Sequence, residues 1–114
     1  MKTRTKNYAL RVVRVVQALP AGRVANVLGG QLLRAGTSVG ANYRAACRAK
    51  STADFINKLK IVEEECDESV YWMELLVESG SMRPKRLESL LEEGDEILSM
   101  VVASLKRQRT AVDS

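Results

Sequence analysis

The densest group of reactive side chains in this sequence is a run of carboxylates, Glu63-Glu64-Glu65 followed by Asp67 and Glu68. Helical carboxylates hold di-iron and di-manganese centres, but those sites also take a histidine from the same helices. The 114-residue sequence contains no histidine, so this ligand set cannot be completed. We therefore interpret the run as solvated, salt-bridging charge, and we expect no metal and no other cofactor.

Cys47 and Cys66 are the only thiols of the sequence. In a helical hairpin that turns near residues 50–51, they lie roughly 18 Å apart at helical rise, which is too far for a disulfide. Two cysteines alone also make no zinc site. We expect both to be reduced packing residues. Without histidine, the usual general base is missing, and the sequence predicts a protein that is not an enzyme.

The charges are divided between the two parts of the chain. Residues 1–50 carry ten lysines and arginines and no carboxylate, whereas the remainder carries 8 basic and 14 acidic residues, for a net charge of +4. Such a division indicates either a nucleic-acid face or two surfaces that pair with each other. No apolar run reaches the ~18 residues of a membrane span, and Arg11 and Arg14 interrupt the first apolar stretch, so we expect a cytoplasmic protein without a signal peptide.

Apolar periodicity and helix-end signals predict an all-α protein. Gly22 follows a Pro-Ala pair, Ser51 precedes Asp54 as in a capping box, Gly80 supplies a stop, and Pro84 suits a first helical turn. We expect one domain over residues 1–114, with helices at about 5–19, 24–49, 51–79 and 84–105 and a flexible tail at 106–114. Short connections between amphipathic helices favour an up-down-up-down antiparallel four-helix bundle.

The helical wheel of residues 24–49 gathers a polar arc without a carboxylate, formed by Gln31, Arg34, Ser38, Asn42, Arg44 and Arg48. In the hairpin, Arg34 lies across from the acidic run. Its guanidinium is predicted to reach Glu64, Asp67 or Glu68, with Ser38 and Asn42 completing a hydrogen-bonded layer. Three interpretations stay open for this layer: a polar layer that fixes helix register, a direct contact with phosphates or bases, or a subunit interface.

A second face of the helix at 51–79 interleaves Ile61, Trp72 and Leu75 with glutamates. Tyr71-Trp72 is a candidate base-stacking pair, but the grouping of Trp72 with Ile61 and Leu75 favours a core or oligomer-interface role. Apolar area left exposed by one bundle is typical of an association site. We therefore expect a homo-oligomer in which these three residues form the candidate interface.

Several motifs resemble one known family. They are Q-L-L-R-A at residues 31–35, S-V-G-A-N at 38–42, F-I-N-K-L at 55–59 and D-E-S-V-Y-W-M-E-L at 67–75, with the basic R-A-K-S junction at 48–51 between them. Over residues 31–80 the sequence resembles the four-helix-bundle family named for the 23S rRNA intervening-sequence protein. The flanking helices fit that family in length and layout.

The resemblance implies a left-handed up-down bundle that often assembles as a barrel-like pentamer. Some members of that family are encoded within inserts of ribosomal RNA genes. A distantly similar branch is the accessory protein of diversity-generating retroelements, which binds RNA and a reverse transcriptase. The resemblance therefore implies RNA or a reverse transcriptase as partners. The lack of a long apolar run, and not the resemblance, predicts that no membrane is involved.

Two functional hypotheses follow. The first is a non-catalytic accessory protein that binds structured RNA, or an RNA–protein complex, through basic helix faces. The candidate phosphate contacts are Arg11, Arg14, Arg44, Arg48 and Lys50. The second is a purely structural or adaptor homo-oligomer whose basic and acidic parts satisfy each other within and between subunits.

Overall fold

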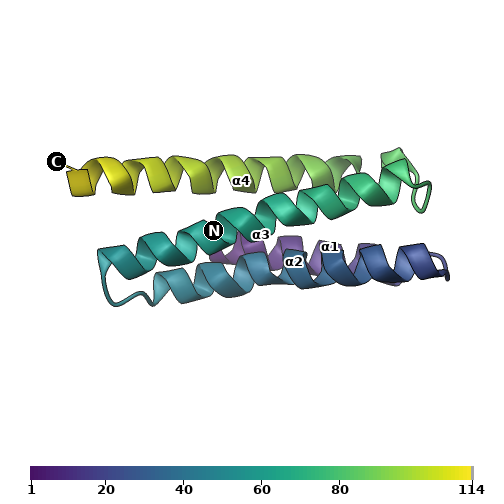
Figure 1. The fold of residues 1–114 in the computed structure, drawn as a ribbon, viewed down its shortest axis with the longest axis horizontal. Coiled ribbons are helices and arrows are strands. Elements are labelled where there is room, and N and C mark those ends of the chain that lie inside the picture. Colours follow the sequence, from purple (N-terminus) through teal and green to yellow (C-terminus); the bar gives the residue numbers. More distant parts are fainter. Residues whose placement is uncertain (114) are drawn as a thin grey trace.

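Four long helices make up the computed structural model, which describes the backbone of residues 1–113 and the side chains of residues 1–111 (Figure 1). In chain order they are α1 (Lys2–Gln17), α2 (Arg23–Cys47), α3 (Thr52–Glu78) and α4 (Pro84–Asp113). They lie side by side in a rod of 51 × 21 × 20 Å. No strand occurs among residues 1–113.

Each helix runs antiparallel to the next and packs on two neighbours. Helix α2 contacts α1 and α3, and α4 contacts α3 and α1, so the four helices close a ring around one core. This confirms the predicted four-helix bundle. The left-handed sense of the bundle stays a prediction.

The turns use the residues that the sequence analysis singled out. The Ser51 hydroxyl accepts a hydrogen bond from the Asp54 amide at 3.1 Å and caps α3. Gly22 and Gly80 have φ angles of 148° and 79°, which side-chain-bearing residues rarely adopt. Helices α1, α2 and α3 consequently lie close to their predicted bounds.

Helix α4 differs from the prediction because it continues past Leu105 to Asp113. The segment after Leu105 consists largely of strong helix formers, which need no apolar stripe to stay helical once the helix is nucleated. Arg107 also donates a hydrogen bond to Ser104 Oγ at 3.0 Å. Within the described residues, the predicted tail at 106–114 is therefore part of α4.

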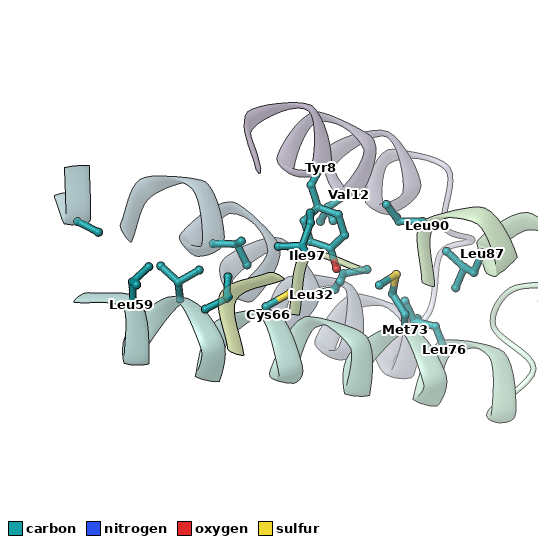
Figure 2. Packing of buried hydrophobic residues seen from close by; sticks show 14 of the residues in the cluster. Tyr8, Val12, Leu32, Leu59, Cys66, Met73, Leu76, Leu87, Leu90 and Ile97 are labelled. Atoms are coloured by element: carbon teal, nitrogen blue, oxygen red, sulfur yellow. The ribbon is translucent and has the colours of Figure 1, made fainter. Parts of the chain in front are cut away.

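The core runs the length of the rod, and its centre is shown in Figure 2. Leu59, Val62, Cys66 and Met73 of α3 are buried and belong to one core cluster with Ile97 and Val101 of α4. Burial raises the pKa of the Cys66 thiol to about 12. Cys47, by contrast, is exposed at the end of α2, so the predicted packing role is wrong for that cysteine.

Tyr8 reaches across the centre of the bundle. Its hydroxyl shares a 2.8 Å hydrogen bond with Ser69 Oγ on α3, the helix diagonally opposite, and Ser69 Oγ also bonds the Cys66 carbonyl at 2.7 Å. A Cβ atom at Gly94 of α4 would lie 2.9 Å from the Tyr8 hydroxyl oxygen. A buried polar group costs stability unless it is hydrogen-bonded, so these contacts fix the position of Tyr8.

Glycines of α2 let α1 approach closely. A Cβ atom at Gly36 would lie 2.8 Å from both γ-carbons of Val12, and one at Gly40 would lie 3.2 Å from the Thr5 carbonyl oxygen. At Gly30, by contrast, an added Cβ meets nothing within 4 Å. The structure therefore shows that α1 packs against Gly36 and Gly40.

A pair of alanine substitutions tests whether α1 packs against Gly36. Gly36→Ala is expected to destabilise the fold by about 1–3 kcal/mol, because the stiff Val12 side chain and α1 must shift. Gly30→Ala, in the same helix but in open space, is expected to stabilise it by up to about 1 kcal/mol through helix propensity. Chemical denaturation followed by circular dichroism measures both. Equal stabilisation by the two substitutions would show that α1 does not pack on Gly36.

Candidate functional site

The acidic run on α3 divides into two faces. Glu65 and Glu68 pair with Arg34 of α2, whereas Glu64 and Asp67 are exposed and make no ion pair among the described residues. Among the described residues, no group of three or more cysteine, aspartate or glutamate side chains is placed to hold a metal ion.

Arg34 lies at the centre of a polar network between α2 and α3. Its Nη1 donates to Glu65 Oε2 at 3.1 Å, its Nη2 pairs with Glu68 Oε1, and its Nε donates to Gln31 Oε1 at 3.1 Å. Of the three predicted partners, Glu68 takes part in this network, whereas Glu64 and Asp67 do not. Positions 65, 68 and 72 share the helical stripe that faces α2, and positions 64 and 67 lie one residue outside it.

Ser38 and Asn42 do not complete the layer that the sequence predicted. Ser38 Oγ donates to the Arg34 carbonyl at 2.7 Å, and Asn42 Nδ2 donates to the Ser38 carbonyl at 2.9 Å. Both side chains bond backward to their own helix, as short polar side chains in helices do. The Arg34 side chain itself is 47% exposed, so the network lies on the bundle surface and not in the core.

Trp72 extends this network outward along α3. Its Nε1 donates to Glu68 Oε1 at 3.1 Å, and its ring meets the Tyr71 ring edge-on at 5.1 Å between centroids. Leu75 is half-buried, while Ile61 and Tyr71 are 37% and 52% exposed. The candidate interface residues therefore leave apolar area accessible on the outer side of α3.

A second ion-pair network, which the sequence analysis missed, joins α1 to α4. Arg4 binds Glu93 through two hydrogen bonds of 2.8 and 2.7 Å and also donates to Glu96 at 2.7 Å. The hydrogen bond from Arg4 lowers the pKa of the Glu93 carboxyl. In the sequence, the Arg4–Glu93 pair was indicated only by the expected antiparallel pairing of the first and last helices, because the two residues are 89 positions apart.

The candidate phosphate contacts fall into two separate groups. Arg11 donates a 2.7 Å hydrogen bond to Ser89 Oγ on α4, and Arg14 is exposed on the outer side of α1. Arg44, Arg48 and Lys50, in contrast, all line one surface hollow at the α2–α3 turn. The structure does not bring Arg11 and Arg14 into contact with that hollow.

Two adjoining hollows share Arg44 and together form what we call the basic end. One, of about 480 Å³, also contains Arg48, Lys50, Lys58 and Asp54. The other, of about 470 Å³, lies between α1 and α2 and adds Lys2 and Lys6. Within the described part of the chain, none of these six cations has a carboxylate within ion-pair distance, and Asp54 is the only acidic residue that lines either hollow.

Comparisons with known proteins agree with this bundle. The family model described as 23S rRNA-intervening sequence protein matches residues 1–103. The chain belongs to this family. A comparison with curated proteins gives no match.

A solved structure of similar fold agrees with the family match. It is the crystal structure of a protein of unknown function from the S23 ribosomal protein family of Bacteroides thetaiotaomicron VPI-5482. That protein is 35% identical to this chain, the match covers 92% of this chain and 97% of the other, and the TM-score is 0.83. Both findings confirm the resemblance inferred from the sequence motifs. No helix of the described residues combines the length and the apolar character needed to cross a membrane.

The Arg4–Glu93 pair predicts a pH-dependent contribution to stability. Because the folded-state pKa of Glu93 lies below its unfolded value, the contribution is present above the unfolded pKa and is lost as pH falls through the folded pKa. Arg4→Met should therefore lower the melting temperature at pH 7 and change it little near pH 2. Arg14→Met, on the same helix but without an ion pair, is the control. A melting-temperature loss for Arg4→Met that is the same at both pH values would contradict this assignment.

Proposed function

We propose that this family member is a non-catalytic, cytoplasmic bundle that binds structured RNA, or an RNA–protein complex, through its basic end. The observation that carries the proposal is the gathering of Lys2, Lys6, Arg44, Arg48, Lys50 and Lys58 around two adjoining hollows with a single carboxylate. Unpaired cations grouped in this way attract polyanions, and the neutralised phosphates release counterions. The family description, which refers to 23S rRNA, agrees with a polyanion of this kind.

The geometry also favours a polyanion over a small anionic ligand. The cations come from three helices and the α2–α3 turn and line two adjoining hollows, of about 470 and 480 Å³, so a single small anion would contact only a few of them. An RNA backbone presents phosphates at regular intervals and can therefore contact the cations of the basic end in turn, from α1 across α2 to α3. Arg11 and Arg14, on another part of the surface, contribute less in this arrangement.

Neutralising the α2–α3 cluster tests this proposal. The triple variant Arg44→Gln/Arg48→Gln/Lys50→Gln should bind a labelled structured RNA about 10- to 100-fold more weakly near 0.1 M salt, because three phosphate contacts are lost. The slope of log affinity against log salt should also fall by roughly 2–3. The matched control is Arg83→Gln/Lys85→Gln/Arg86→Gln, which removes the same charge at the opposite end of the rod.

Filter binding between 50 and 200 mM salt gives both quantities. Affinity that stays flat over this range, or equal losses in the two triple variants, would show that the basic end does not bind RNA. Circular dichroism of each variant checks that the bundle is intact.

We further propose that the protein is a homo-oligomer, a pentamer by resemblance to its family. The support is the exposed apolar area of Ile61 and Tyr71 beside Trp72 and Leu75, which a partner subunit would cover. This surface also favours the alternative function, a purely structural or adaptor oligomer that ignores nucleic acid. In that case the protein assembles but does not bind RNA specifically, so the two triple variants do not differ from the wild type in RNA binding.

Ile61→Glu tests the interface without touching the core. We expect this variant to dissociate, because a charge would be buried unpaired between subunits. Leu10→Glu is the matched control, since Leu10 is a similarly exposed apolar residue on α1. Light scattering during size exclusion gives the masses. A wild-type mass of 12.6 kDa, that of one chain, or equal effects of the two variants would contradict the proposed interface.

A further inference from the structure

The hollow between α1 and α2 is the part of the basic end whose lining distinguishes one class of RNA from another. Its volume is about 470 Å³. Three of the residues that line it are small, namely Ala9 of α1 and Gly40 and Ala41 of α2. Small residues between two helices let a broad, rigid surface approach the backbone, so the hollow is not restricted to a thin, extended ligand.

Cations border this hollow on both helices. Lys2 and Lys6 of α1 are four residues apart, as are Arg44 and Arg48 of α2, so each pair follows one face of its helix over about 6 Å. Because α1 and α2 pack side by side (Figure 1), the two pairs form two rows separated by about one helix spacing, roughly 8–10 Å between axes. Two rows of positive charge suit a ligand with two rows of phosphates.

The lining of the basic end offers no platform for unpaired bases. Proteins that bind single strands combine a basic groove with aromatic side chains on which successive bases stack. Among the described residues that line the two hollows, none is aromatic. Tyr71 and Trp72 contact each other on α3 and line neither hollow. The lining therefore favours an RNA whose bases are already paired.

Thr37 of α2 supplies a polar group that can recognise ribose. Its Oγ1 donates to the Leu33 carbonyl at 2.7 Å and also lies 3.2 Å from the Arg34 carbonyl oxygen. Because the hydroxyl proton is used within the helix, the oxygen is left as an acceptor toward the hollow that Thr37 lines. The 2′-hydroxyl of RNA can donate to such an acceptor, and DNA has no equivalent group.

We propose that the α1–α2 hollow binds double-stranded RNA across its minor groove. This inference rests on the proposed RNA function and specifies the class of RNA. The minor groove of an A-form duplex is wide and shallow and displays 2′-hydroxyls between the two phosphate strands. The two cation rows contact phosphates of both strands, and Thr37 accepts a hydrogen bond from a 2′-hydroxyl between them. Such contacts recognise the shape of the duplex and not its base sequence.

The first test compares three fluorescein-labelled probes of one mixed sequence with the full chain. They are an RNA duplex of about 20 base pairs, which exceeds the length that a duplex-binding domain spans, one of its strands alone, and the matching DNA duplex. Fluorescence anisotropy near 0.1 M salt measures the affinities. The RNA duplex should bind about tenfold more tightly than either other probe, because paired phosphates and 2′-hydroxyls are recognised together.

The second test removes the acceptor of Thr37. Thr37→Val keeps the shape of the side chain and should weaken binding of the RNA duplex roughly 2- to 10-fold, the range of one hydrogen bond. Affinity for the DNA duplex should stay unchanged, which also shows that the variant is folded. Thr110→Val is the matched control, since Thr110 Oγ1 makes the same backward bond, 2.9 Å to the Lys106 carbonyl, and lines neither hollow.

The outcomes separate this inference from the proposal on which it rests. Equal affinities for the RNA duplex and its single strand, equal affinities for the RNA and DNA duplexes, or equal effects of the two valine substitutions would overturn the inference and leave RNA binding in place. If none of the probes binds, or if the α2–α3 triple variant binds the RNA duplex as tightly as its control does, the proposed function fails and the inference fails with it.

Discussion

Helix α1 completes the bundle only because α2 carries hydrogen atoms where side chains would otherwise stand. The backbone positions of Gly36 and Gly40 leave room for Val12 and for the carbonyl of Thr5. This close approach sends Tyr8 through the core to Ser69 and lays Arg4 against Glu93. The same approach places Lys2 and Lys6 beside Arg44, so one of the two basic hollows exists only because α1 is seated there.

The linear division of charge in the sequence becomes a division in space once some of the charges are paired. Arg34 and Arg4 are neutralised by Glu65, Glu68, Glu93 and Glu96. Both networks lie away from the α2–α3 turn. Six cations without an ion pair gather where the start of α1, the end of α2 and the start of α3 meet; they are Lys2, Lys6, Arg44, Arg48, Lys50 and Lys58. Since Asp54 is the only acidic residue among those described that lines these hollows, positive charge dominates there although the net charge of the chain is only +4.

The sequence predicted local structure better than it predicted partners. Helix starts and the cap at Ser51 follow from spacing within one helix, and the motifs at residues 31–80 pointed to the correct family. Of the predicted partners of Arg34, Glu68 is an observed one, whereas Glu65 binds in place of Glu64 and Asp67. A shift of one residue rotates a side chain by about 100° around a helix, which is enough to turn Glu64 away. The Arg4–Glu93 pair links the two ends of the chain, and no local pattern indicates it. The predicted α4 was too short because helix propensity, and not apolar periodicity, extends this helix past Leu105.

The candidate phosphate contacts of α2 and α3 gather at one end of the rod. The α3–α4 turn mixes both signs of charge, with Arg83, Lys85 and Arg86 close in sequence to Glu78 and Glu88. The end that holds the α2–α3 turn instead combines six cations with a single lining carboxylate, Asp54, among the described residues. Because the field at a surface follows the local charge and not the net charge, this asymmetry would steer an approaching polyanion toward the α2–α3 turn.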